Sequence, residues 1–473
     1  MHLIVNRRRL NEECVKKPVE VTAMPERGKG LEKHRYSPER DEGALLPRYT
    51  DLVGREAIRE LKEYRERFSG KIVHVNSTFE GGGVAELLER EVRLSNELGI
   101  QMEWYKILGH DDFFDTTKGF HNALQGKSSD NALALIKNYH HFYNNGGREL
   151  NSPLIEYLRT LGEEDVLLIH DPQPLYLINF LEDVKALKLW RIHIDTTAPD
   201  ARTMEYVISH AKRYHGIIST MEDFIKPHVE GYEQLFTLAP SIDPFSDKNS
   251  AMGSEEVEER VLKHGIRAGL PLLVQVSRLD PWKDPVGVVR AFDMIRDSGR
   301  KCQLALVYNS ASDDPEGAAM EALVREERAQ SLYRKDIHLV LGDDPRDVNA
   351  FQRYASIVIQ KSIREGFGLT VTEALYKNNI VVATEVGGIA LQVQDNTTGY
   401  TISPYRVTDD GTPSSLHEYR EHISALAERC LHILNRPEES RKIAAQGGKR
   451  VLKNFLAISA LQNLYDILIS YKQ

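Results

Sequence analysis

Two glutamates and two glycines lie close together in the C-terminal half of the chain. Seven residues separate Glu365 from Glu373, and Gly366 and Gly368 lie between them. An apolar, strand-like run precedes this stretch and a helical pattern follows from Leu369, which predicts a strand, a glycine loop and a helix. Backbone amides at such a helix start bind anions, and glycines let a phosphate approach the main chain. A carboxylate repels a phosphate, so we expect the glutamates to accept hydrogen bonds from sugar hydroxyls beside it. The pattern indicates a nucleotide-sugar site; a solvated turn followed by an ordinary surface glutamate is the alternative.

A second motif carries two cations. Arg278 and Lys283 follow an apolar run at residues 271–276, and Pro281 between them predicts a turn rather than a helix. Both side chains can therefore converge on one anion, with arginine offering a fork and lysine a point charge. A diphosphate has the charge that such a pair neutralises. The alternative is a basic strand end in solvent.

Together the two motifs resemble those of the retaining glycosyltransferases with two Rossmann-like domains, the GT-B fold. The resemblance implies an α/β protein with two doubly wound domains facing a deep cleft. It also implies that Arg278 and Lys283 bind the leaving diphosphate, Glu373 the ribose and Glu365 the donor sugar. The amides that complete the donor cradle would be those of Gly366, Phe367, Gly368 and Leu369.

Composition excludes several classes of partner. The chain has 473 residues, 41% hydrophobic and 28% charged, with a net charge of −9. This length predicts two or three globular domains, and the acidic balance argues against a nucleic-acid partner. Three cysteines without a close pair fit a reduced compartment. With no signal peptide and no apolar run of membrane-spanning length, we expect a cytoplasmic protein without a membrane partner, and a homodimer.

A glycine loop also follows the first apolar strand of the N-terminal half. Residues 72–75 predict a buried strand, residues 81–83 are three glycines, and a helix follows to about Leu98. The loop lacks the dinucleotide-binding fingerprint, so no nicotinamide cofactor is indicated. We expect Gly82 and Gly83 to let a donor approach the backbone; a flexible turn is the alternative. Glu80 is a candidate carboxylate near the acceptor, with plain solvent exposure as its alternative.

Further polar residues occur where predicted strands end. His170 and Asp171 follow one apolar run, and His193 and Asp195 lie at the end of the next. Ligands of parallel sheets bind at the carboxyl ends of strands, although a histidine there is often a satisfied structural group. We assign Asp171 and His193 to the acceptor. The GT-B resemblance places a donor-sugar contact at His170, which we group with Arg278, Lys283 and Glu365 as catalytic.

Several stretches together resemble one family in particular, the nucleotide-sugar-dependent trehalose synthases, with the trehalose phosphorylases as relatives. They are residues 74–78, the glycine loop and the residues after it to Glu86, and residues 118–126, 170–174 and 240–244. The resemblance runs from about Val53 to the C-terminus. It implies transfer of glucose from UDP-, ADP- or GDP-glucose onto glucose, with retention of the α-anomer and reversibly, to give α,α-trehalose.

The same patterns predict the domain organisation. We expect an N-terminal extension at residues 1–48, an acceptor domain at 49–245 and a donor domain at 246–455. The GT-B resemblance returns the last helix, about 456–473, to the acceptor domain. Residues 51–68 predict one amphipathic helix, and residues 113–125 a polar and aromatic loop leading into a helix.

Metal-independent transfer is expected, without a cofactor. The adjacent pairs Asp313–Asp314 and Asp343–Asp344 lie in turns and are more typical of helix caps than of metal ligands. Two other functions stay open at this point. A phosphorylase using glucose 1-phosphate needs the same cations and glutamates but no nucleotide pocket. A catalytically silent sugar or nucleotide sensor would keep the fold, but the intact Arg278, Lys283, Glu365 and Glu373 argue against it.

Overall fold

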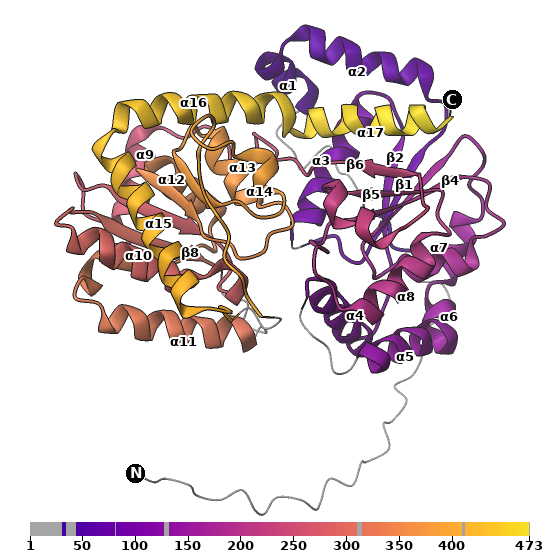
Figure 1. Cartoon of the computed structure of the whole chain (residues 1–473). Helices are drawn as coiled ribbons and strands as arrows, with labels where there is room; N and C mark the ends of the chain where they lie inside the picture. The colour runs from indigo at the N-terminus through magenta and orange to yellow at the C-terminus, as the bar shows by residue number, and fades with distance from the viewer. Residues whose placement is uncertain are drawn as a thin grey trace, which may run out of the picture.

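The computed structural model describes residues 31–34, 44–80, 82–126, 132–309, 315–408 and 412–472. Gly81, Asp313, Asp314 and most of the predicted N-terminal extension lie outside these ranges. The described chain forms two parallel sheets of six strands each, both flanked by helices (Figure 1). This confirms the predicted fold class of two doubly wound α/β halves.

The N-terminal sheet has the order β2-β1-β3-β4-β5-β6, and each neighbouring pair is parallel. Its first four strands are buried on both faces, apart from the last residue of β2, which is why they read as continuous apolar runs. The strands are β1 Ile72–Asn76, β2 Met102–Lys106, β3 Val166–His170, β4 Leu187–Ile192, β5 Gly216–Ser219 and β6 Leu235–Thr237.

The C-terminal sheet has the order β12-β11-β10-β7-β8-β9 and is likewise parallel throughout. Its strands are β7 Leu272–Val276, β8 Gln303–Tyr308, β9 Ile337–Leu341, β10 Ile357–Gln360, β11 Val381–Thr384 and β12 Tyr400–Ile402. Five of its strands, all except β9, are wholly buried.

Each sheet reverses its winding direction once. In the N-terminal sheet the chain leaves β1 toward β2 and returns on the other side with β3; in the C-terminal sheet it leaves β7 toward β8 and β9 and returns with β10. Crevices for ligands form at the carboxyl ends of strands beside such switch points. The glycine loops after β1 and β10, the cations after β7 and the histidine that ends β3 all lie at these two points.

Helices cover both faces of each sheet. Three of them begin at a capping aspartate: the side chains of Asp200, Asp284 and Asp344 accept bonds from the first-turn amides of α8, α10 and α12. The predicted capping role of Asp344 is thereby confirmed. The α-helices are α1 Leu45–Val53, α2 Arg55–Arg67, α3 Gly83–Glu97, α4 Asp111–Leu124, α5 Ala132–Phe142, α6 Arg148–Leu150, α7 Ser152–Leu158, α8 Ala201–Ala211, α9 Ser254–Leu262, α10 Pro285–Asp297, α11 Pro315–Gln330, α12 Pro345–Tyr354, α13 Leu369–Tyr376, α14 Ile389–Gln392, α15 Leu416–Asn435, α16 Pro437–Asn454 and α17 Ala457–Lys472.

The last two helices connect the halves. α16 lies along the C-terminal half, and α17 continues across to the N-terminal half, where it packs on α3 (Figure 1). Tyr465 of α17 donates to Ser95 Oγ of α3 at 2.8 Å. Ile242 lies in the segment that joins the two sheets, and its backbone forms hydrogen bonds with the residues on both sides of Leu456. One apolar core includes residues of α3, α13 and α17 and therefore spans both halves. The predicted domain limits stay a prediction.

Two helical predictions need correction. The helix expected at residues 51–68 is two helices, α1 and α2, because Gly54 between them has φ 91°, a left-handed conformation that ends a helix. The loop expected from residue 113 is already helical, since α4 begins at Asp111 and buries Phe113 and Phe120. Phe113 and Phe120 thus belong to the core of the N-terminal half.

Candidate active site

The glycine loop after β10 leads directly into α13. Gly368 has φ 84° and stands at the N-cap of α13, a conformation that glycine adopts without strain. The carbonyl of Phe367 accepts a hydrogen bond of 2.5 Å from the buried side chain of Gln392, which holds the loop against α14. The first amides of α13 therefore point out of the helix N-terminus, as an anion site requires.

Lys283 and Glu365 come together although they follow different strands. The Nζ of Lys283 lies 2.5 Å from Oε2 of Glu365, and Ser362 Oγ donates to the same oxygen at 3.1 Å. Both ionic side chains are largely buried. Arg278 extends further out: 72% of its side chain is exposed, and its Nη2 lies 3.2 Å from Asp280 Oδ2. One cation of the predicted pair is thus held in the loop, while the other reaches toward solvent.

Glu373 faces a cavity between the two halves. Its side chain is buried one turn into α13, and burial raises its pKa, while the charges of Lys377 and Lys248 oppose that shift. The cavity has a volume of about 240 Å³ and is lined from α3, from the segment after β6, from the start of α12 and from α13. Lys248 closes one side by an ion pair of 2.7 Å with Glu86 of α3.

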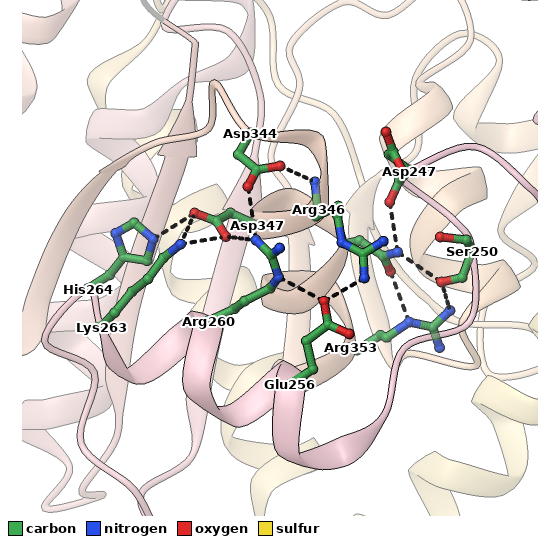
Figure 2. Close-up of polar contacts among 11 residues, drawn as sticks. Asp247, Ser250, Glu256, Arg260, Lys263, His264, Asp344, Arg346, Asp347 and Arg353 are labelled. Carbon is green, nitrogen blue, oxygen red and sulfur yellow. Dashed lines mark hydrogen bonds and ion pairs between the residues drawn. The ribbon is translucent and has the colours of Figure 1, made fainter. Parts of the chain in front are cut away.

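The segment that carries Lys248 is fixed to α12. Arg353 Nη2 donates to the carbonyls of Asn249 and Ser250 at 3.0 Å, and Asn349 donates to those of Asp247 and Ser250 at 2.9 Å. Figure 2 shows the contacts with Asp247 and Ser250 beside a second group of ion pairs that joins α9 to the start of α12. In that group Asp347 accepts from Arg260, Lys263 and His264. These contacts hold the wall of the cavity next to Glu373 in place.

Glycines of one half pack against the backbone or side chains of the other. A Cβ added to Gly366 would lie 2.9 Å from the carbonyl oxygen of His193, and one added to Gly83 would lie 3.0 Å from Leu369 Cδ1. Arg364, which stacks over Trp282 at 4.9 Å, donates across the same boundary to the carbonyl of Gln125. The two glycine loops therefore face each other at close range.

Three histidines lie next to this boundary. His74 Nδ1 is 2.9 Å from His170 Nε2, and His170 Nδ1 is 3.0 Å from His193 Nε2. Burial lowers the pKa of each ring, to about 3 for His74, which favours the neutral form of all three. His74 and His170 are fully buried, while His193 is half-buried. His170 therefore meets the boundary through His193, and the catalytic role predicted for it stays a prediction.

The acceptor-site candidates differ in their surroundings. Asp171 is buried with φ 58°, its Oδ1 accepts from the backbone amide of His193 at 2.8 Å, and burial raises its pKa to about 7. Glu80 is exposed in the loop after β1, where its backbone pairs with Thr78. Gly82, at φ 83°, is the N-cap of α3. The predicted roles of all these residues stay predictions.

Some residues at the boundary were missed from sequence. Lys248 belongs to no recognisable motif, whereas Trp282 and Arg364 lie directly before Lys283 and Glu365 in the two motifs without having been singled out. Only the fold brings all three to this boundary. Burial, together with the charge of Arg278, lowers the pKa of His121 of α4 to about 4. His121 lies in the last turn of α4, and its place in the polar stretch at residues 113–125 was the available signal.

Two negative observations apply to the part of the chain that the structure describes. There, no three His, Cys, Asp or Glu side chains gather closely enough to hold a metal ion. None of the helices in the same residues is long and apolar enough to cross a bilayer. Metal independence stays a prediction.

Comparison with known proteins decides the family. The trehalose synthase N-terminal domain family matches residues 74–226, and the group 1 glycosyl transferases match residues 256–410. A trehalose synthase from Pyrococcus horikoshii is 35% identical over 426 residues, which cover 90% of this chain and 96% of that protein. The chain belongs to the trehalose synthase family and is a glycosyltransferase.

More distant matches extend the comparison. A trehalose phosphorylase from Pleurotus pulmonarius is 28% identical, covering 76% of this chain and 54% of that protein. A crystal structure of a UDP-forming α,α-trehalose-phosphate synthase from Burkholderia xenovorans aligns with a TM-score of 0.65 at 16% identity, over 85% of this chain and 99% of that one. At this identity the likeness concerns the fold, and it confirms the GT-B architecture expected from the motifs.

Proposed function

We propose that the protein transfers glucose from a nucleotide diphosphate glucose to free glucose and forms α,α-trehalose, with retention and reversibly. The bond between the donor C1 and the phosphate oxygen breaks with its electron pair on the diphosphate. A bond forms between C1 and the anomeric oxygen of the acceptor, whose proton passes to the leaving phosphate on the same face. This route requires no protein nucleophile and no metal.

The residues take the following roles in this proposal. Arg278, Lys283 and the amides that open α13 stabilise the charge that develops on the diphosphate, where preorganised electrostatics lower a barrier most. Glu365 accepts from donor-sugar hydroxyls and Glu373 from the ribose. Gly82 and Gly83 let the donor approach, Asp171, His193 and Glu80 serve the acceptor, and His170 acts through His193.

The cavity beside Glu373 supports a nucleotide sugar, rather than glucose 1-phosphate, as the donor. The glycine loop separates this cavity from the Lys283–Glu365 pair. Its volume of about 240 Å³ suits a nucleoside, and the buried carboxylate of Glu373 faces it. A buried carboxylate that faces a cavity needs hydrogen-bond donors in place of bulk water, and two ribose hydroxyls supply matching donors. Glucose 1-phosphate has no group to place there.

Phosphorolysis is the second candidate, because a trehalose phosphorylase is among the relatives. It uses the same cations and glutamates, but it releases inorganic phosphate and leaves the cavity beside Glu373 without a function. A silent sensor would bind the same ligands without turnover.

Proton NMR of the products separates these candidates. The protein is mixed, with a chelator and no added metal, with UDP-, ADP- or GDP-glucose and glucose labelled with ¹³C at C1. We expect labelled α,α-trehalose and the free nucleotide diphosphate in equal amounts from at least one donor. Trehalose from glucose 1-phosphate but from no nucleotide sugar would establish the phosphorylase instead. Nucleotide binding without any product would indicate a sensor.

A further inference from the structure

Four polar side chains share one face of the N-terminal sheet near its switch point. In the register of the sheet His74 of β1 lies beside Leu168 of β3, and His170, two residues further, lies beside Arg191 of β4. Side chains two residues apart point to the same face, so His193 extends the same row. Deeper in the sheet this face is apolar and packs on α3. The row is therefore a polar line that runs through the core toward the glycine loop.

The hydrogen bonds make this row continuous. His170 uses both ring nitrogens, one toward His74 and one toward His193, and its side chain has no exposed surface. Each bond between two neutral imidazoles needs one hydrogen and one lone pair. The proton on the first ring therefore fixes the tautomer of the other two, and only two arrangements of the whole row are consistent.

The inner end of the row decides between these arrangements. His74 Nε2 is buried and has no hydrogen-bond partner, and the neighbouring Arg191, bound through Nη1 to Glu91 at 3.4 Å, has an equally unpartnered Nη2. An orphaned N–H in a protein core is rarer than an orphaned acceptor. A nearby guanidinium also favours a lone pair over a second N–H. Nε2 of His74 therefore carries no hydrogen.

We propose that Arg191, His74 and His170 are positioning residues that hold His193 in the tautomer with hydrogen on Nδ1. His74 donates through Nδ1 to His170, which donates through Nδ1 to Nε2 of His193. His193 then presents Nδ1–H as a fixed donor at the boundary, where its backbone touches Gly366. Under the proposed function, which this step presupposes, that donor serves an oxygen of the bound sugar.

A spectroscopic test needs no measurement of activity. Two-bond proton–nitrogen correlation spectra of protein labelled with ¹⁵N-histidine distinguish neutral histidine tautomers, and single substitutions assign the relevant rings among the 17 histidines. We expect His74, His170 and His193 all to be neutral with hydrogen on Nδ1 at pH 8. Hydrogen on Nε2 of any of the three would overturn the proposal. Because the readout is structural, it holds even if the glycosyl acceptor is not glucose.

A matched pair of substitutions then tests the direction in which the histidines of the row donate their hydrogen bonds. His74→Asp offers only acceptors, has Arg191 beside it as counterion, and is expected to turn His170 and His193 to the Nε2–H form. We expect kcat to fall roughly 10- to 100-fold at unchanged KM, by analogy with the loss of a residue that orients a metal-binding histidine. His74→Asn, whose amide has an N–H near the position of Nδ1, is expected to recover most of that loss.

The control is His210→Asn, a buried histidine of α8 whose Nδ1 lies 3.1 Å from the carbonyl of Tyr206, outside the row. It should leave kcat and the His193 tautomer unchanged. A His74→Asp protein with reversed tautomers but full kcat would show that the Nδ1–H of His193 has no part in transfer. If His74→Asp fails to fold, the wild-type spectrum still decides the tautomer.

Discussion

Lys283 Nζ lies 2.5 Å from Glu365 Oε2, joining residues 82 positions apart that follow two neighbouring strands, β7 and β10. The side chain proposed for the diphosphate and the one proposed for the donor sugar thus share one ion pair. A substrate that carries a phosphate and a sugar hydroxyl at adjacent positions matches both partners. Under the proposed function, the pair would lie beside the bond between sugar and phosphate.

Lys283→Met should cost more stability than the loss of both charges. The single change leaves Glu365 largely buried without its cation, at an expected cost of about 1–3 kcal/mol in the free energy of unfolding. The double variant Lys283→Met/Glu365→Gln lacks both charges, and it should melt at a higher temperature than the Lys283→Met protein. Thermal melts of the three proteins measure this. A Lys283→Met protein as stable as wild type would mean that the pair does not form in solution.

The Lys283→Met protein should also lose transfer activity about 10²- to 10³-fold.

Glu373→Gln should weaken nucleotide binding more than sugar binding. Hydrogen bonds to a charged group contribute about 1.5–3 kcal/mol, so we expect the Kd for the nucleotide diphosphate to rise roughly 10- to 100-fold. Isothermal titration with each nucleotide diphosphate measures this change. Glu428→Gln, an exposed glutamate of α15, is the matched control. An unchanged Kd would remove Glu373 from the nucleotide site.

Gly366→Ala should impair transfer with little effect on the melting temperature. The added Cβ would lie 2.9 Å from the carbonyl oxygen of His193 in the other half, so the clash opposes approach of the halves rather than folding of either. A displacement of about 1 Å in the reacting groups reduces turnover roughly 10²-fold. Steady-state kinetics and small-angle scattering test this together. Gly253→Ala, where a Cβ would meet nothing within 4 Å, should behave as wild type. Full activity in Gly366→Ala would show that this contact is not made during turnover.

Asp171→Asn should become relatively more stable as pH rises. Burial raises the pKa of Asp171 from 3.8 to about 7. Below pH 4 the carboxyl is protonated in both states; between pH 4 and 7 the unfolded chain ionises while the folded protein keeps the proton, so stability falls with rising pH. Asparagine does not titrate, tolerates φ 58° and keeps the bond from the His193 amide. Between pH 5 and pH 8 the variant should gain about 3 kcal/mol relative to wild type.

Urea unfolding at the two pH values measures that difference. A constant gap between wild type and Asp171→Asn would show that Asp171 is ionised throughout this range, with its charge stabilised by Arg191 and the His193 amide.

The sequence by itself determined the local parts of this protein. Apolar runs alternating with helical patterns implied two parallel sheets, because a strand covered on both faces must be apolar throughout. The glycine loop before Leu369 and the turn at Pro281 were likewise readable, since a helix start and a turn depend on a few adjacent residues. The same local signals identified Glu365, Glu373, Arg278 and Lys283 as candidates.

Only the tertiary structure decided which of these parts meet. The order of strands puts β7 beside β10 and β1 beside β3, and this order alone pairs Lys283 with Glu365 and links His74 to His170. The core shared by α3, α13 and α17 sets how the halves dock, and with it the contact of Gly366 with His193. Such contacts depend on the packing of apolar surfaces far apart in the chain, which no local pattern of residues encodes.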